Sequence, residues 1–325
     1  NAAIIEGSKV FSKDLMQKYH IPTAEYRVFD DPRAAIEYIT EKNEFPTVIK
    51  ADGLALGKGV LIPESLEEAV AGVKEIMEDK VFGASGNHIV VEEFLTGPEV
   101  SVLSFTDGKC VRPMVSSMDH KRALDGDKGL NTGGMGTVSP NPYYTEAVAQ
   151  QCMDTIFLPT IAAMNAEGRT FQGCLYFGLM LTPKGPKVIE YNCRFGDPET
   201  EVVLPRLKSD IVEIFSAVAD GWELEHPLEW HDFSTVGVVL ASKGYPGSYA
   251  KGAVIEGLDE VDGAVYHMGT ASKEGRIVTA GGRVAIVVCA APTLGEALEK
   301  CNREVGKVRC DNLFHRTDIG RKAIK

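Results

Sequence analysis

The chain has 325 residues, of which 44% are apolar and 25% charged, an ordinary globular composition that excludes a disordered or collagen-like protein. Forty-six acidic residues against 34 basic ones give a net charge of −12, which disfavours extended contact with a nucleic-acid backbone. No apolar run approaches the roughly 20 residues needed to cross a bilayer, so we expect neither nucleic acid nor a membrane as a partner.

The cysteines and the first residues suggest where the chain works and what it is part of. Seven cysteines without a CxxC pair give little support to a disulfide framework or a thiolate zinc site. A reducing compartment fits better, so we expect a cytoplasmic protein. The opening NAAIIEGSKVFSK has neither an initiating Met nor a secretion signal, and we expect the chain to begin part-way through a longer protein.

The first third of the chain predicts helices and strands around a glycine-rich loop. Ser8 is placed to cap a helix that ends before Pro22, and Asp31 to cap a second helix. Residues 47–51 (TVIKA) predict a β-branched strand, which the loop DGLALGKG joins to a short strand over 60–62.

This loop has the composition of an anion-binding loop. Lys50 lies on the first strand, and glycines such as Gly53 and Gly57 let backbone N–H groups approach an anion while Lys58 adds charge. The spacing is not that of the Walker motif, because Gly59 rather than Ser or Thr follows the lysine. An ordinary hairpin loop with solvated lysines explains the same residues about equally well.

Three strands are predicted over 88–95, 99–105 and 110–116, with a hairpin turn at Asp107-Gly108 between the last two. The end of the first strand carries groups that suit a nucleoside, with backbone atoms for the base edge and carboxylates for the ribose hydroxyls. These residues are Glu92, Glu93, Phe94, Leu95 and Glu99. Taken alone the pattern is weak, since charges at a strand end are usually just solvated.

Residues 119–142 predict a long glycine-rich loop, and a loop of this length inside a compact domain is more often functional than idle. Lys121 and Arg122 form a basic pair that suits a phosphate group. His120 beside them is better explained as a structural hydrogen-bonding residue than as a catalytic base, because no second acid or base stands at a fixed spacing.

The rest of the chain predicts a helix split by Pro159, two strands, and a further α+β region after a break near residue 222. The predicted ranges are helix 145–167, strands 171–181 and 187–193, helix 208–219, strands 235–242, 264–269 and 283–291, and helix 294–308. No GxSxG elbow or HExxH motif occurs, which argues against a covalent hydrolase or a zinc protease.

The segment VIEYNCRFGDPE (188–199) carries the strongest chemical pattern. Alternate side chains share one face of a strand, so Glu190, Asn192 and Arg194 point the same way. A carboxylate and an amide oxygen suit Mg²⁺, and an arginine one step further can stabilise a transferring phosphoryl group. The plain alternative is an edge strand with a local ion pair, but three mutually useful groups on one face favour function.

The order of these motifs closely resembles the phosphoribosylamine–glycine ligase (glycinamide ribonucleotide synthetase) family of the ATP-grasp superfamily. The strings that carry the resemblance are SK at a helix start, KADGLALGKGV, VVEEFL, DHKR, NTGGMG and NCRFGDPE. The resemblance implies an α/β (α+β) fold, with an ATP-grasp domain over 1–221, a small lid subdomain at about 22–92 and a β-rich C-terminal domain over 222–325. It also implies that the family's N-terminal domain precedes residue 1. Some members are part of a larger multifunctional purine-synthesis polypeptide, which allows the same for this chain.

The resemblance also implies a reaction. ATP with Mg²⁺ or Mn²⁺ would activate glycine as glycyl phosphate, and the amine of 5-phosphoribosylamine would attack it to give glycinamide ribonucleotide, ADP and phosphate. Two alternatives stay open. The chain could be an ATP-binding fragment that is inactive without the N-terminal domain, or another ATP-grasp ligase, such as a carboxylase acting on a purine precursor or on biotin.

The roles that the resemblance implies fall on residues already singled out. The nucleotide contacts would be Lys9, Lys50, Gly57, Lys58, Glu92, Glu93, Phe94, Leu95, Glu99, Arg122 and Asn131. Glu190 and Asn192 would bind the metal, Arg194 would stabilise the acyl phosphate, and Asp197 would help to hold the ammonium group of glycine. Asp119 and Lys121 would lie on the phosphoribosylamine side. The preceding strand, YFGLML, offers no further carboxylate for a metal.

Overall fold

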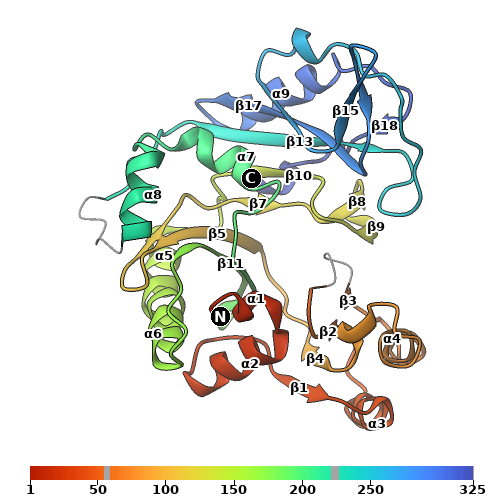
Figure 1. The fold of residues 1–325 in the computed structure, drawn as a ribbon, viewed down its shortest axis with the longest axis vertical. Helices are drawn as coiled ribbons and strands as arrows, with labels where there is room; N and C mark the ends of the chain where they lie inside the picture. Colours follow the sequence, from red (N-terminus) through yellow and green to blue (C-terminus); the bar gives the residue numbers. More distant parts are fainter. Residues whose placement is uncertain (55–58, 221–226, 325) are drawn as a thin grey trace.

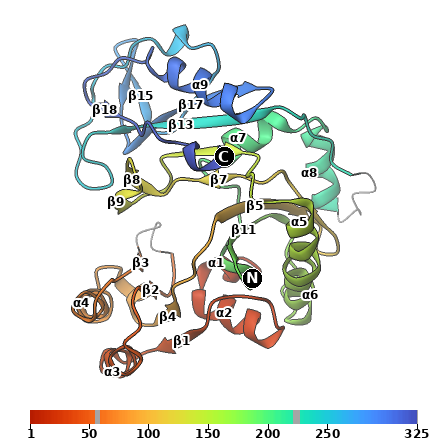
Figure 2. The same cartoon turned by 180° about the vertical axis from the view of Figure 1, so that it is seen from behind.

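The computed structural model describes residues 1–54, 59–220 and 227–324. Its strands form three main antiparallel sheets, which lie one after another along the molecule, with the second sheet between the other two (Figures 1 and 2). No helix in this described part is long and apolar enough to span a bilayer.

The first sheet has four strands in the order β1–β4–β2–β3. Its elements are β1 (Tyr26–Phe29), α3 (Pro32–Lys42), β2 (Thr47–Ala51), β3 (Val60–Leu61), α4 (Leu66–Met77), η1 (Gly83–Gly86) and β4 (Ile89–Glu93). The predicted helix cap is confirmed, because the Asp31 carboxylate accepts hydrogen bonds from the backbone N–H groups of Arg33 and Ala34. Apolar residues of α3 and α4, among them Ile39 and Val73, form a buried cluster with strand residues of this sheet.

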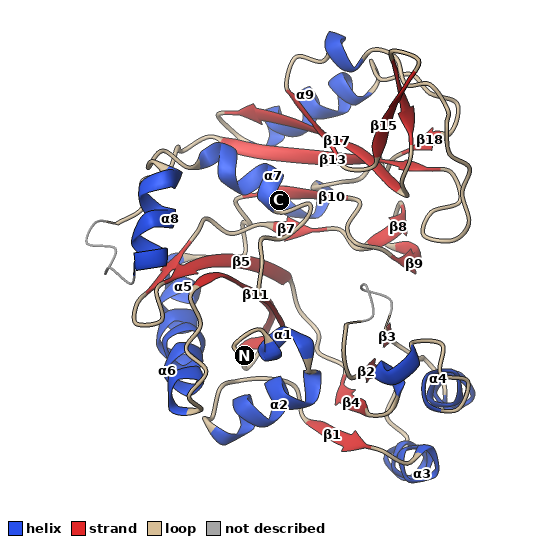
Figure 3. Cartoon of the chain, viewed as in Figure 1, coloured by secondary structure: helices blue, strands red, loops and turns tan. Residues whose placement is uncertain are grey.

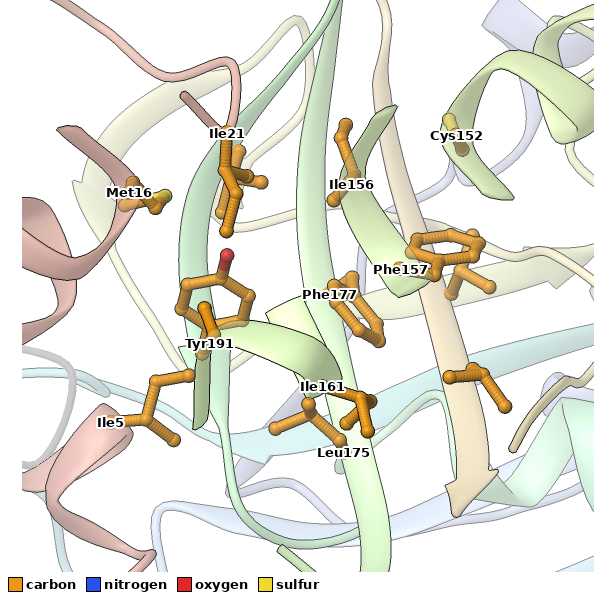
Figure 4. Close-up of a cluster of buried hydrophobic side chains, with 14 of the residues drawn as sticks. Ile5, Met16, Ile21, Cys152, Ile156, Phe157, Ile161, Leu175, Phe177 and Tyr191 are labelled. Atoms are coloured by element: carbon orange, nitrogen blue, oxygen red, sulfur yellow. The ribbon is translucent and has the colours of Figure 1, made fainter. Parts of the chain in front are cut away.

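The second sheet has the order β12–β11–β5–β6 and lies at the centre of the molecule. Its strands are β5 (Glu99–Thr106), β6 (Val111–Pro113), β11 (Gly173–Thr182) and β12 (Gly185–Asn192), and its helices are α1 (Ile4–Gly7), α2 (Lys9–Lys18), α5 (Glu146–Cys152), η2 (Met153–Phe157) and α6 (Leu158–Ala166). Figure 4 shows their shared core, in which Met16 and Ile21 approach Tyr191 and the rings of Phe157 and Phe177 lie side by side, tilted by 46°. The hairpin predicted at Asp107-Gly108 is confirmed by the pairing of β5 with β6.

The predicted helix over 145–167 is present, with a change of winding in its middle. η2 is a π-helical turn that separates α5 from α6, and Pro159 lies in the first turn of α6. A proline at that position would interrupt the hydrogen bonds of a continuous α-helix, and the π turn just before it absorbs the irregularity. Figure 3 shows the helices stacked alongside β5 and β11.

The third sheet has six strands and takes them from both sides of residue 222. Its path is β14–β17–β13–β10–β7, with β18 also paired to β13. The elements are β7 (Met118–Asp119), β10 (Gly136–Ser139), α7 (Thr200–Val203), η3 (Leu204–Arg206), α8 (Ile211–Asp220), β13 (Ser234–Ser242), η4 (Leu258–Glu260), β14 (Ala264–His267), β17 (Arg283–Ala291), α9 (Leu294–Val305), β18 (Leu313–Phe314) and η5 (Arg321–Ala323). The division into two domains at residue 222 stays a prediction. β10, before this residue, and β13, after it, are hydrogen-bonded neighbours, so one sheet extends across the proposed boundary.

The prediction of a single long loop over 119–142 is wrong. This segment contains the end of β7, the hairpin of β8 (Arg122–Leu124) and β9 (Lys128–Asn131), and β10. Its glycines suggest a loop locally, but the register of β10 pairs Gly136 with Val238, far along the chain. A second hairpin, β15 (Thr270–Lys273) with β16 (Arg276–Thr279), was also not predicted, since its residues alternate only weakly.

Candidate functional site

The candidate site forms where the first sheet meets the edge of the second. Lys50 on β2 donates a hydrogen bond of 3.1 Å to the carbonyl oxygen of Ile189 on β12, the residue before Glu190. The lysine-bearing strand and the oxygen-bearing strand, which the sequence predicts to serve one nucleotide, therefore lie against each other.

The start of α2 is tied to the loop that follows β2. Ser8 caps the helix, and its hydroxyl also donates to Asp52 Oδ1 at 3.1 Å. Lys9 donates a 2.8 Å hydrogen bond to the carbonyl oxygen of Gly53. Burial lowers the pKa of Lys9, and the charge of Lys50 lowers it further, although the Glu190 carboxylate opposes the change. Gly57 and Lys58, predicted to contact the nucleotide, lie outside the described residues.

A buried carboxylate joins two lysines beneath this loop. Glu92 Oε1 lies 3.0 Å from Lys50 Nζ, and Glu92 Oε2 lies 2.9 Å from Lys13 Nζ. All three side chains are nearly inaccessible to solvent. Burial lowers the pKa of Lys13 to about 8, even though Glu92 acts in the opposite direction. Sequence reasoning missed Lys13; the available signal was its position one helical turn after Lys9, which places both lysines on one face of α2.

Glu190 lies among cations. Its Oε1 is 3.6 Å from Lys121 Nζ, which is also 3.9 Å from Glu99 Oε2. Burial acts to raise the pKa of Glu190, but the charges of Lys121, Lys50 and Lys9 outweigh it and hold the pKa below its ordinary value. Burial likewise acts against the charged form of Lys121, yet the carboxylates of Glu190 and Glu99 keep its pKa well above normal. Both groups are therefore charged at neutral pH.

Glu190 and Asn192 fit a divalent cation that takes its other ligands from phosphates and water. They lie on β12 opposite Gly178 and Tyr176 of β11, so the neighbouring strand adds no carboxylate. Among the described residues no group of three or more His, Cys, Asp or Glu side chains could hold a metal ion. One ionised carboxylate and one amide oxygen suit Mg²⁺, which usually keeps several waters and binds through few protein groups.

Arg194 and Asp197 follow β12 and already have protein partners. The Arg194 side chain is 57% exposed, with Nε 3.7 Å from Glu6 Oε1. Its Nη2 donates a long hydrogen bond of 3.4 Å to Asn192 Oδ1. Asp197 Oδ1 lies 3.0 Å from Arg283 Nη1, and Arg283 is not among the residues predicted from the sequence.

The residues predicted to hold adenine and ribose take up different environments. The side chain of Glu92 faces the two lysines, while Glu93 forms a 2.6 Å ion pair with Lys187. Phe94 is 40% exposed, Leu95 is half-buried, and Glu99 is exposed except for its contact with Lys121. Their roles toward a nucleotide stay predictions.

The remaining predicted residues lie on the strands of the glycine-rich segment. Arg122 and Asn131 are paired across the β8–β9 hairpin, and Arg122 Nη1 donates to the Gly129 carbonyl at 2.8 Å. Asp119 ends β7, where burial and the charge of Glu199 raise its pKa well above the ordinary value. The charge of Lys121 acts in the opposite direction, so Asp119 lies within the influence of both Glu199 and Lys121.

Comparison with known proteins identifies the family to which these features belong. Residues 7–200 match the family model described as phosphoribosylglycinamide synthetase, ATP-grasp (A) domain, and residues 235–322 match the C domain of the same enzyme. The phosphoribosylamine–glycine ligase of Halalkalibacterium halodurans is 50% identical over 99% of this chain and 75% of its own length. The chain belongs to the phosphoribosylamine–glycine ligase family. The Salmonella typhimurium relative, 48% identical, is matched over 100% of this chain and 76% of its own length.

Solved structures support the family and its fold. A phosphoribosylamine–glycine ligase from Thermotoga maritima superposes with a TM-score of 0.87 at 37% identity, over 98% of this chain and 80% of that one. A biotin carboxylase from Campylobacter jejuni superposes with a TM-score of 0.71 at 14% identity, over 96% of this chain and 68% of that one. The second likeness speaks for the fold alone. The predicted α+β ATP-grasp fold is confirmed.

Proposed function

We propose that this chain is an ATP-dependent ligase that joins glycine to 5-phosphoribosylamine in purine biosynthesis. Its curated relatives carry the name of that enzyme over nearly the whole chain. The observation that carries the proposal in this molecule is the hydrogen bond of Lys50 to the backbone beside Glu190. It brings the cations suited to a triphosphate next to the oxygens suited to its metal ion.

The reaction balances in two steps. A carboxylate oxygen of glycine bonds to the γ-phosphorus of ATP, and the bond to the bridging oxygen breaks, which gives glycyl phosphate and ADP. The amine nitrogen of phosphoribosylamine then attacks the acyl carbon, phosphate leaves with the bonding electron pair, and the nitrogen loses a proton. The product is glycinamide ribonucleotide.

The residues of the chain supply charge and position. Lys9 and Lys50 are proposed to neutralise phosphate oxygens, and the charge of Lys121 favours the ionised form of Glu190. Glu190 and Asn192 would hold a magnesium or manganese ion, which would supply positive charge to neutralise the phosphates. Arg194, exposed beside Asn192, is suited to stabilise the acyl phosphate. Asp197 is proposed to help hold the ammonium group of glycine. Asp119 and Lys121 are proposed to lie on the phosphoribosylamine side of the site.

The experiment is a coupled assay of ADP release. Glycine with phosphoribosylamine should stimulate release, and bicarbonate should not, which separates this reaction from that of an ATP-grasp carboxylase. The assay should be run on this chain and on a form completed to the length of its relatives, because the chain spans about three quarters of them. ATP binding without glycine-dependent release in both forms would favour a binding module instead.

Three further features stay proposals. The seven cysteines are all free, which supports a reducing, cytoplasmic setting. Membership of a larger multifunctional polypeptide and the domain boundary near residue 222 rest on the sequence resemblance. Size measurement of the natural protein would test the first of these two, and limited proteolysis at the boundary would test the second.

A further inference from the structure

Arg283 connects two loops of the candidate site from outside both of them. It begins β17, and its Nη1 donates to the carbonyl oxygens of Gly133 at 3.0 Å and of Asp197 at 2.9 Å. The same nitrogen lies 3.0 Å from Asp197 Oδ1. One guanidinium nitrogen thus holds the glycine-rich segment, the loop after β12 and an acidic side chain at a single point.

The backbone N–H of Gly133, like its carbonyl oxygen, has a hydrogen-bond partner in the C-terminal region. The N–H of Gly133 donates a 3.1 Å hydrogen bond to the hydroxyl oxygen of Tyr245. A Cβ atom at Gly133 would lie 2.8 Å from Arg283 Cζ, and one at Gly282 would lie 2.3 Å from the Tyr245 ring. Side chains at these two glycines would therefore push the arginine and the tyrosine away from the loop.

The two loops also touch each other directly. A Cβ atom at Gly134 would lie 2.5 Å from Pro198 Cδ and 2.7 Å from Asp119 Oδ1, so only a glycine permits this approach. The positive φ of Gly134, 119°, independently requires glycine there. The glycine-rich segment is thus enclosed between Arg283 on one side and Pro198 with Asp119 on the other.

We propose that Arg283 is a positioning residue for glycine recognition, which locks the two loops together and presents the Asp197 carboxylate to the ammonium group of the substrate. The inference rests on the proposed function, in which Asp197 binds glycine. The ion pair joins Arg283 Nη1 to Asp197 Oδ1, and among the described residues no hydrogen bond is made to Asp197 Oδ2. A planar guanidinium can satisfy several acceptors in fixed directions, which a lysine ammonium cannot do as well.

Arg283 also supplies the charge that its surroundings need. The carboxyl group of Glu201 lies near those of Asp197 and Glu199, and burial together with their charges raises the pKa of Glu201 to about 7. Without the guanidinium, mutual repulsion would favour rotation of the exposed Asp197 side chain away from its neighbours. The loop contacts and the charge balance therefore depend on the same side chain.

The test compares Arg283→Met and Arg283→Lys with a matched control, Arg309→Met. Arg309 belongs to the same C-terminal region and forms a 2.6 Å ion pair with Glu260, far from either loop in its contacts. We expect the KM for glycine to rise about tenfold or more in Arg283→Met, equivalent to about 1.4 kcal/mol, with the KM for ATP within about twofold of wild type. Arg283→Lys should restore part of the loss, and Arg309→Met should change neither constant.

Hydrogen exchange supplies a second readout that needs no activity. Amides of 133–135, 195–197 and 199 should exchange faster in both Arg283 variants, while those of the middle of β17 should not change. An unchanged KM for glycine overturns the proposal, and so does an equal rise in the KM for ATP. If Arg283→Met does not fold, the same criteria apply to Arg283→Lys. If the wild-type chain, completed to the length of its relatives, shows no glycine-dependent ADP release, the proposed function fails. The hydrogen-exchange rates would then test only whether Arg283 holds the two loops together.

Discussion

The buried group of Lys13, Glu92 and Lys50 gives a quantitative prediction for Glu92→Gln. Glutamine keeps the shape of the side chain and removes its charge, so two ammonium groups would lose their counter-ion. The side chains are 2%, 4% and 6% exposed, in that order, so solvent cannot replace the carboxylate. Removal of one partner from a buried ion pair costs about 3–5 kcal/mol, because the other charge stays buried.

The contribution of Lys13 to this loss has an upper limit. Its pKa is about 8, roughly one unit above neutral pH, so it can release its proton at a cost of about 1.4 kcal/mol. Most of the destabilisation must then come from Lys50, which among the described residues keeps only its bond to the Ile189 carbonyl. We expect a total loss of about 3–5 kcal/mol at pH 7.

Urea unfolding followed by circular dichroism measures this loss, with Glu93→Gln as the matched control. Glu93 is the next residue on β4, and its ion pair with Lys187 is partly exposed, at 33% and 22%. Exposed pairs contribute about 1 kcal/mol or less, so the control should change stability little. If the two variants lose equal stability, the buried group does not work as described. Adding Lys13→Met to Glu92→Gln should recover at most about 1.4 kcal/mol, because one uncompensated charge is removed and its cost cannot exceed that of releasing the Lys13 proton.

Three further predictions concern single side chains. Arg194→Ala should reduce turnover about 100-fold or more with ATP affinity within about threefold, as measured by ADP release and nucleotide titration. His120 has its pKa lowered to about 4 by burial and by Arg316, so the unfolded chain binds the extra proton between about pH 6.5 and 4, and stability should fall by about 3 kcal/mol across that window as pH decreases. His120→Gln should abolish this part of the pH dependence of unfolding. Glu201, with a raised pKa of about 7, binds its proton more tightly when folded, so stability should fall as pH rises from about 4.5 to 7, by about 1 kcal/mol after allowance for solvent screening. Glu201→Gln should therefore raise the melting temperature at pH 8 more than at pH 4.5.

Local patterns predicted those parts of the fold that depend on neighbouring residues. Ser8 caps its helix through a bond to an N–H three residues on, and Asp107-Gly108 turns a hairpin between adjacent strands. Alternation along β12 also placed Glu190 and Asn192 on one face, because a strand has a period of two residues whatever it packs against. The pair proposed as metal ligands could for this reason be selected without a structure.

The parts that were missed depend on contacts between distant segments. β10 is a strand because it pairs with β13, and its own glycines favour a loop. Arg283 reaches Gly133 and Asp197 only because the start of β17 packs beside the loops that contain them. Neither contact is accompanied by a periodic pattern or an unusual composition in the sequence around these residues. Analysis of a short stretch of sequence therefore could not predict it.

The site shows how an acidic protein can bind a highly anionic substrate. Around Glu92 and Glu190 the fold gathers four lysines, Lys9, Lys13, Lys50 and Lys121, although the chain as a whole has a net charge of −12. Their mutual repulsion and burial are visible in the lowered pKa values of Lys9 and Lys13. A triphosphate would relieve that repulsion, since it supplies the negative charge that the two carboxylates do not. The repulsion between the lysines destabilises the nucleotide-free site, and its relief would make the binding free energy of the nucleotide more favourable. The gain would be largest for a ligand that carries several adjacent negative charges.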